Sequence, residues 1–303
     1  MKLPTEVRIV EVGPRDGLQN EPRPVSVENR IALIERLAAC GLRHIEAGAF
    51  VSPRRVPQMA GSGDVLAGLP RLPGVRYSAL VPNAQGMAGA LAARVDEIAV
   101  FAAASEAFSQ KNIQCSIDES LRRFEPVITR ARASGVAVRG YVSCALVCPW
   151  QGEIPPDDVR RLARALFEMG VEEISLGDTI GAGTPRKAQA MIEAVARDVP
   201  VERLAGHFHD TYGMAIANIY AAMEVGIRVF DSSVAGLGGC PYAPGASGNV
   251  ATEEVVWLMQ GLGIGTGVNL GRLVDTAAWI SAQLNRLPAS RVSQAMSAAA
   301  SSG

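Results

Sequence analysis

The stretch Leu204-Ala205-Gly206-His207-Phe208-His209-Asp210 holds two of the three histidines of this 303-residue chain in a short, mostly apolar run. A run of this length predicts a β-strand, in which side chains two positions apart point to the same face. His207 and His209 would then face one way, within reach of a single metal ion, because neutral imidazole is a common metal ligand. Two hydrogen-bonded histidines on a half-buried strand are the alternative interpretation.

This strand is the seventh in a regular alternation of strands and helices. Strands are predicted at residues 7–12, 44–50, 77–81, 97–101, 136–143, 173–176, 204–209 and 229–233. Helices are predicted after the cap Ser26 and at residues 84–93, 118–133, 156–169, 185–196, 215–225 and 253–262. Eight strand–helix units favour an α/β fold of the closed (β/α)₈ TIM-barrel type over a doubly wound sheet, which needs no eighth unit.

The domain organisation follows from the same pattern. We expect a single barrel domain over residues 1–285, with an additional C-terminal helix after about Asn269. Residues 286–303 end in a low-complexity run of alanine, serine and glycine and are predicted to form a partly mobile tail.

Composition limits the classes of partner. A formal net charge of -1 gives no reason to expect a nucleic-acid surface. The chain has neither an apolar run long enough for a membrane helix nor the apolar core of a signal peptide at its start. Five scattered cysteines favour free thiols in a reducing cytoplasm over disulfides, and over a metal pair formed by Cys144 and Cys148.

Polar residues gather where the predicted strands end, which is where barrel enzymes carry their active sites. Asp16 follows strand one, and we expect it to join the two histidines as an oxygen ligand, although a plain turn residue is the alternative. Asn249, which ends the long glycine-rich loop after strand eight, is a candidate fourth ligand. Imidazole with oxygen ligands suits Mg²⁺, Mn²⁺ or Zn²⁺.

Three further residues suggest chemistry near this metal. Arg15 would offer a permanent positive charge to an oxyanion, unless it forms only a surface ion pair. Glu46, inside strand two, would need a partner if buried, and Arg15 is the obvious candidate. Cys240 stands in the glycine-rich loop, either as an inert thiol or as one that donates or accepts a proton or acts as a nucleophile.

The sequence also resembles the 3-hydroxy-3-methylglutaryl-CoA lyase family from about residue 7 to residue 262. Residues 12–21 (Val-Gly-Pro-Arg-Asp-Gly-Leu-Gln-Asn-Glu), 50–53, 56–59 and 206–213 look like motifs of that family. The Arg-Asp and His-x-His-Asp pieces also occur in the wider metallolyase superfamily of aldolases and condensing synthases. Residues 233–242 resemble the cysteine-loop signature, which is much more specific to the lyases.

The resemblance implies a (β/α)₈ barrel that needs Mg²⁺ or Mn²⁺ but no organic cofactor. Its acyl-CoA thioester substrate would be (S)-3-hydroxy-3-methylglutaryl-CoA, cleaved to acetyl-CoA and acetoacetate by a homodimer or higher homo-oligomer. The implied metal ligands are Asp16, His207, His209 and Asn249. Arg15 would stabilise the enolate, Glu46 would orient Arg15, and Cys240 would protonate the enolate. Gln19, Tyr141 and Thr179 would contact the substrate.

Some points stay open at this stage. Asp16 and His207 are both candidate bases for the substrate alcohol, and Lys111 is a candidate phosphate contact or a solvated lysine. Arg54 and Arg55 stand where the family usually has a tryptophan, so the accepted acyl group is undecided. A lyase for a related 3-hydroxy-3-alkylglutaryl-CoA, a Claisen-type acyltransferase and a non-catalytic metal-binding barrel are the alternative functions.

Overall fold

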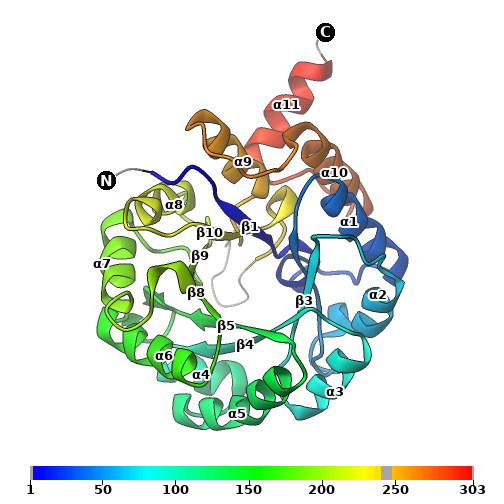
Figure 1. The fold of residues 1–303 in the computed structure, drawn as a ribbon. Coiled ribbons are helices and arrows are strands. Elements are labelled where there is room, and N and C mark those ends of the chain that lie inside the picture. Colours follow the sequence, from blue (N-terminus) through cyan, green and yellow to red (C-terminus); the bar gives the residue numbers. More distant parts are fainter. Residues whose placement is uncertain (1–2, 240–247, 302–303) are drawn as a thin grey trace.

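Eight parallel strands close into a barrel with the helices outside it (Figure 1) in the computed structural model, which describes residues 3–239 and 248–301. The barrel strands are β1 (Arg8–Glu11), β2 (His44–Ala49), β3 (Arg76–Leu80), β4 (Glu97–Ala103), β5 (Ala137–Ser143), β8 (Glu173–Asp178), β9 (Leu204–Phe208) and β10 (Val229–Ser232). Their order around the barrel is β1-β10-β9-β8-β5-β4-β3-β2. Because β1 pairs with both β2 and β10, the sheet closes on itself, which confirms the predicted (β/α)₈ barrel.

The helices follow the strands in the order that the sequence pattern predicts. They are α1 (Val27–Ala39), α2 (Ser62–Gly68), α3 (Ala84–Ala92), α4 (Glu106–Ile113), α5 (Ile117–Ala133), α6 (Pro156–Glu168), α7 (Pro185–Val195), α8 (Ala215–Glu224), α9 (Thr252–Gly261), α10 (Leu270–Gln283) and α11 (Arg291–Ser301). Short polar side chains cap several of these helices, as Ser26 does by accepting a hydrogen bond from the backbone N–H of Asn29. The end of α1 requires glycine: Gly41 has a φ of 105°, and a Cβ there would lie 2.1 Å from the carbonyl oxygen of Gly267.

Some elements were not predicted from the sequence. The helices α2 and α4 are short and bury few apolar residues, so their helical periodicity is weak. A small antiparallel hairpin, β6 (Val147–Cys148) with β7 (Gly152–Glu153), lies between β5 and α6. Helix α11 occupies part of the segment expected to be a mobile tail and projects from the barrel in Figure 1. Whether that segment moves stays a prediction.

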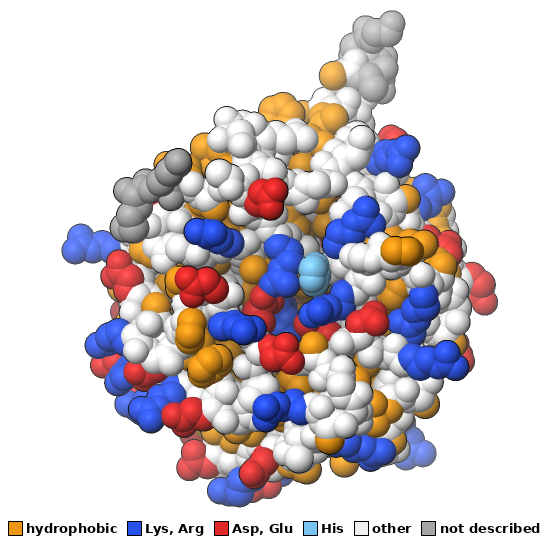
Figure 2. All heavy atoms as spheres, viewed as in Figure 1, with side chains coloured by type: hydrophobic (Ala, Val, Ile, Leu, Met, Phe, Trp, Pro, Cys, Tyr) orange, Lys and Arg blue, Asp and Glu red, His pale blue; other side chains and the backbone are white. Residues whose placement is uncertain are grey.

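The face at which the strands begin is closed by charged side chains. Figure 2 shows Lys, Arg, Asp and Glu side chains gathered around a histidine at the centre of this face. Arg8, the first residue of β1, pairs with Glu173 and lies 3.3 Å from the Nε2 of His44. Arg76 pairs with Glu97 at the starts of β3 and β4. The open end of the barrel, with the candidate site, is therefore the opposite one.

Candidate active site

A buried carboxylate links the turns that follow β1 and β10. Glu11, the last residue of β1, accepts hydrogen bonds from the backbone N–H groups of Gly13 and Val234 at 2.8 and 2.9 Å. Its second oxygen accepts one from the hydroxyl of Thr252 at 2.7 Å. These contacts fix the π-helical turn η1 (Gly13–Gly17), which carries Arg15 and Asp16, against the end of β10.

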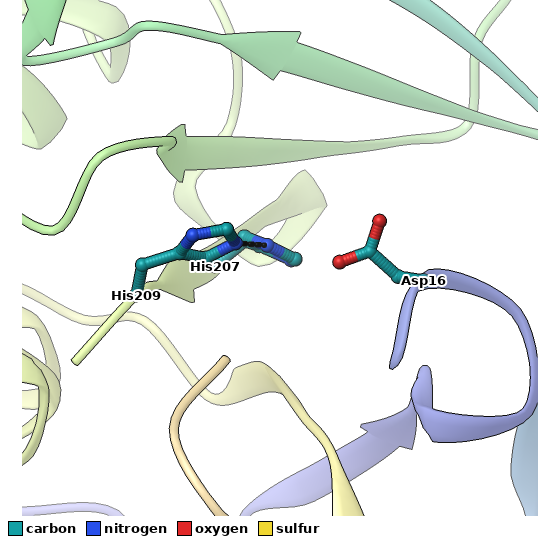
Figure 3. A group of neighbouring side chains, drawn as sticks. All are labelled: Asp16, His207 and His209. Carbon is teal, nitrogen blue, oxygen red and sulfur yellow. Dashed lines mark hydrogen bonds between the residues drawn. The ribbon is translucent and has the colours of Figure 1, made fainter. Parts of the chain in front are cut away.

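The two histidines and Asp16 converge on one point, as the sequence pattern predicts. One candidate ligand atom from each of the three residues lies within 4.8 Å of the other two. The Nε2 atoms of His207 and His209 are 3.1 Å apart, and the Asp16 carboxylate faces both rings (Figure 3). Among the described residues this is the one group of three or more His, Cys, Asp or Glu side chains with such spacing. Its donor atoms suit a divalent cation.

Asp16 is held as an anion by its neighbours. Burial opposes its charge, but Arg15, followed by His207 and His209, lowers the pKa of the carboxyl to about 2. Arg15 donates to Oδ1 at 2.7 Å, and the amide nitrogen of Asn249 donates to Oδ2 at 2.8 Å. The amide nitrogen of Asn249 thus faces Asp16, and a ligand role for Asn249 stays a prediction.

Arg15 is buried and locked between two carboxylates. Its Nε donates to Glu46 Oε2 at 2.7 Å, so the expected contact between Arg15 and Glu46 is present. Burial opposes the charge of the guanidinium, yet Glu46 and Asp16 raise its pKa above the usual value. The guanidinium carbon also lies 5.5 Å from the ring centroid of Tyr141, which has the geometry of a cation–π contact. The catalytic roles of Arg15 and Glu46 stay predictions.

His207 has a partner that the sequence analysis did not single out. Asp231, buried in β10, lies 3.1 Å from His207 Nδ1 and accepts two hydrogen bonds from Arg139. Burial disfavours a proton on His207, but the Asp231 contact raises its pKa. Burial and then His207 lower the pKa of His209 to about 4, so His209 is neutral near pH 7. Asp231 and Arg139 could have been noticed in the sequence, because each is a single charged residue inside a predicted strand of mostly uncharged neighbours.

A cavity of about 720 Å³ lies beside these residues at the ends of the barrel strands. Gln19, Tyr141 and Thr179 line it, as expected, together with Arg15, Asp16, His207 and His209. An apolar part extends toward α4 and α5 and is lined by Phe101, Phe108, Ile113 and Phe124. Lys111 is not among the lining residues: its Nζ lies 5.6 Å from the ring centroid of Trp150, while its neighbour Asn112 lines the cavity. A phosphate contact for Lys111 stays a prediction.

Cys240 falls in residues 240–247, outside the described part of the chain, so its predicted role stays a prediction. The other four cysteines, Cys40, Cys115, Cys144 and Cys148, are buried, and Cys40, Cys115 and Cys148 are free thiols. Cys148 accepts a hydrogen bond from the hydroxyl of Ser105, which agrees with a packed thiol better than with a metal pair.

The fold and the site together define a class: a (β/α)₈-barrel enzyme with a candidate divalent-metal centre where its strands end. A family model described as HMGL-like matches residues 6–280, and the chain belongs to this family. Its relatives are named as hydroxymethylglutaryl-CoA lyases, which cleave a carbon–carbon bond, and the chain is an enzyme of the lyase class.

Three relatives show how far the similarity extends. The hydroxymethylglutaryl-CoA lyase of Pseudomonas mevalonii is 60% identical over 96% of this chain and 97% of its own length. A Pseudomonas aeruginosa protein named 3-hydroxy-3-isohexenylglutaryl-CoA/hydroxy-methylglutaryl-CoA lyase is 59% identical over 99% of this chain and all of its own length. The mitochondrial hydroxymethylglutaryl-CoA lyase of Bos taurus is 55% identical over 97% of this chain and 90% of its own length.

Solved structures agree with these relatives. The hydroxymethylglutaryl-CoA lyase structure from Pseudomonas aeruginosa superposes with a TM-score of 0.97 at 59% identity, covering 98% of this chain and 99% of that one. An HMG-CoA lyase structure from an Acinetobacter baumannii source, described as a complex with coenzyme A and 3-methylmalate, has a TM-score of 0.92 at 33% identity and covers 97% of this chain and 96% of that one.

Proposed function

We propose that this chain is a divalent-metal-dependent hydroxymethylglutaryl-CoA lyase, which cleaves (S)-3-hydroxy-3-methylglutaryl-CoA to acetyl-CoA and acetoacetate. The observation that carries the proposal is the convergence of Asp16, His207 and His209 within 4.8 Å, with the fixed charge of Arg15 beside them, in the wall of one cavity. The names of its relatives support the substrate.

The donor set fits the metal that the family implies. Two imidazole nitrogens and a carboxylate suit Mg²⁺ or Mn²⁺, and their candidate ligand atoms lie within 4.8 Å of one another. Asp16, His207 and His209 would hold the ion, and Asn249 would join them through its amide oxygen. When bound, such an ion supplies Lewis-acid chemistry, because it lowers the pKa of a coordinated hydroxyl.

The chain's own residues account for the rest of the reaction. The substrate's C3 hydroxyl gives its proton to Asp16 as the C2–C3 bond breaks, and the bonding electrons form an enolate on the thioester. Arg15, held by Glu46, places its guanidinium where negative charge gathers on the thioester oxygen. We assign protonation of the enolate carbon to Cys240. The former C3 alcohol becomes the ketone of acetoacetate.

The cavity supports an acyl-CoA as the substrate. Its volume of about 720 Å³ suits a ligand of considerable size, and the exposed Arg55 and Arg123 lie in its wall, where cations can meet phosphate groups. A lyase for a longer 3-hydroxy-3-alkylglutaryl-CoA is the second candidate. The name of the Pseudomonas aeruginosa relative and the arginine at position 55 favour testing it.

The setting of the reaction completes the proposal. No helix in the described ranges is long and apolar enough to cross a membrane. The buried free thiols of Cys40, Cys115 and Cys148 suit a reducing compartment such as the cytoplasm. We retain a homodimer or higher homo-oligomer as the proposed assembly.

A direct assay tests the function. Purified protein with Mg²⁺ and (S)-3-hydroxy-3-methylglutaryl-CoA should release acetoacetate and acetyl-CoA in equal amounts, and EDTA should stop the reaction. His207→Ala, which removes a proposed ligand, should be nearly inactive. Release of free CoA without acetoacetate would contradict a carbon–carbon cleavage, and cleavage limited to a longer 3-alkyl homologue would select the second candidate.

A further inference from the structure

The contact between His207 and Asp231 is part of a built arrangement on four neighbouring strands. Asp231 on β10 pairs in register with His207 on β9, and both its side chain and that of Ser175 on β8 are buried. Asp231 Oδ2 accepts a hydrogen bond from the Ser175 hydroxyl at 2.7 Å and lies 3.1 Å from His207 Nδ1. The carboxylate therefore meets the ring on the side opposite the Nε2 atom that faces His209.

Arg139, only 1% exposed, fixes the orientation of this carboxylate. Its Nη2 donates to Asp231 Oδ1 at 2.8 Å and its Nη1 to Oδ2 at 3.1 Å, so the guanidinium binds both carboxylate oxygens in a bidentate pair. Arg139 is itself held from the other side, where its Nε donates to Glu173 Oε1 at 2.9 Å. Glu173 in turn pairs with Arg8 at the face where the strands begin.

We propose that Asp231 and Arg139 are a positioning pair for the candidate metal centre. Asp231 keeps the proton of neutral His207 on Nδ1, so that the lone pair of Nε2 is available to the cation, and its negative charge strengthens that nitrogen as a donor. Arg139 keeps the carboxylate from turning away. Neither residue touches the cation or the substrate in this assignment. The inference rests on the proposed metal dependence and adds the residues that prepare its ligand.

A purely structural ion pair is the competing explanation, because a buried arginine needs a carboxylate in any case. The two explanations differ in what a neutral replacement does. The double variant Arg139→Gln/Asp231→Asn removes both charges and leaves no orphan charge in the barrel. A structural pair would be replaced adequately by two amides, whereas a positioning pair would lose the charge that orders His207.

Titration with Mn²⁺ alone, followed by the electron paramagnetic resonance signal of free Mn²⁺, measures the effect without turnover. Asp231→Asn and the double variant should weaken Mn²⁺ binding by about 10–100-fold, the usual consequence of losing such a partner. Glu173→Gln is the matched control, because it makes the same acid-to-amide change in the same network one step farther from His207. It should bind Mn²⁺ as the wild type does.

Nitrogen-15 NMR of the metal-free protein gives a second readout. The chain has three histidines, so His44→Gln and His209→Gln variants identify the His207 signals. Wild-type neutral His207 should carry its proton on Nδ1, and the double variant should show a mixture of tautomers. Should Asp231→Asn fail to fold, the double variant decides the matter.

The outcomes separate the two proposals. Wild-type Mn²⁺ affinity together with an unchanged His207 tautomer in the folded double variant would overturn the positioning pair. A wild type that binds no Mn²⁺ would overturn the metal centre, while the NMR measurement would still decide whether Asp231 sets the tautomer.

Discussion

Arg15 keeps a full positive charge at a position that is only 6% exposed. It can do so because Glu46 and Asp16 each accept a hydrogen bond from it at 2.7 Å. A guanidinium held by two carboxylates at fixed angles cannot swing toward solvent when the substrate enters. The remaining donors of the fork are therefore oriented before the reaction begins, which is what an oxyanion-stabilising group requires.

Arg15→Lys tests this geometry at constant charge. The ammonium of lysine cannot hydrogen-bond to Glu46, Asp16 and a thioester oxygen at once in the fixed planar geometry of a guanidinium. We therefore expect kcat to fall by about 10²–10³-fold, as for a lost oxyanion donor, with little change in KM. Steady-state kinetics measure both constants, and the exposed Arg130→Lys provides the control. A kcat close to the wild-type value would show that the guanidinium does not face the developing charge.

Cys240 is the other residue whose chemistry one substitution can test. Cys240→Ser keeps the size of the side chain but replaces the thiol with a much weaker acid. We expect a strong loss of kcat with unchanged Mn²⁺ binding, and protection by substrate against thiol alkylation. The buried Cys144 and Cys148 serve as controls. Retained activity in Cys240→Ser, with loss in Cys144→Ser or Cys148→Ser, would assign the proton to another cysteine.

The metal-site residues were predictable for a simple reason. His207 and His209 share one face of a strand, and the ends of parallel strands in a barrel meet at one face, so Asp16 had to lie near them. The pairing of Asp231 with Arg139 was not predictable, because it joins side chains of β10 and β5 across the barrel interior. Sequence spacing alone does not reveal which inward-facing charges meet there.

At the level of elements, α9 links helix α11 to the turn that follows β10. Glu253, near the start of α9, accepts hydrogen bonds from the backbone N–H of Ala235 at 2.9 and 3.1 Å and from the Ser293 hydroxyl at 3.0 Å. The backbone N–H of Ala289 donates to the Ala235 carbonyl at 3.0 Å. Ala235 has a left-handed φ of 59°, which costs free energy for a non-glycine residue, so these contacts stabilise it.

This contact predicts a dependence of stability on pH. Burial raises the pKa of Glu253 from 4.5 to about 8, so the folded protein keeps a proton there that the unfolded chain loses. Its contribution to stability is complete below about pH 4.5 and declines as the pH rises to about 8. Glu253→Gln cannot lose this proton, so its unfolding free energy should fall less over that range.

Urea unfolding at several pH values measures this difference. Glu168→Gln is the control, because its exposed pair with Arg164 contributes little to stability. Parallel curves for the wild type and Glu253→Gln would contradict the pKa assigned to Glu253.

The strong periodicities of the sequence located most elements to within a few residues. Helix α1 follows its serine cap, and the eight predicted strands all appear in the barrel. The weaker elements were missed because tertiary contacts stabilise them. Helix α11 is an example: its sequence is rich in alanine and serine, and its start is held by the contact of Glu253 with Ser293 and of Glu254 with the backbone N–H of Arg291.

For the whole molecule, the candidate metal centre joins parts of the chain that are far apart in sequence. A cation bound to Asp16 on one side and to His207 and His209 on the other stabilises only the folded state. Free Mn²⁺ at 100 times its dissociation constant should add about 2.7 kcal/mol to the free energy of unfolding, and EDTA should remove it. Calorimetry of the wild type should show the higher Tm with Mn²⁺, whereas His207→Ala should show no increase. An equal shift in both would place the cation elsewhere.

The closure of the barrel between β1 and β10 also constrains how the chain is made. Arg8 to Glu11 pair in register with Val229 to Ser232. Strand β1 therefore cannot pair with β10, its second neighbour, until most of the chain has been synthesised. Until then Glu11 has no Val234 or Thr252 to bind, and Asp16 has no histidines opposite it. A chain whose synthesis has not yet reached β10 can therefore complete neither the barrel nor its candidate catalytic centre, and it leaves one edge of β1 unpaired.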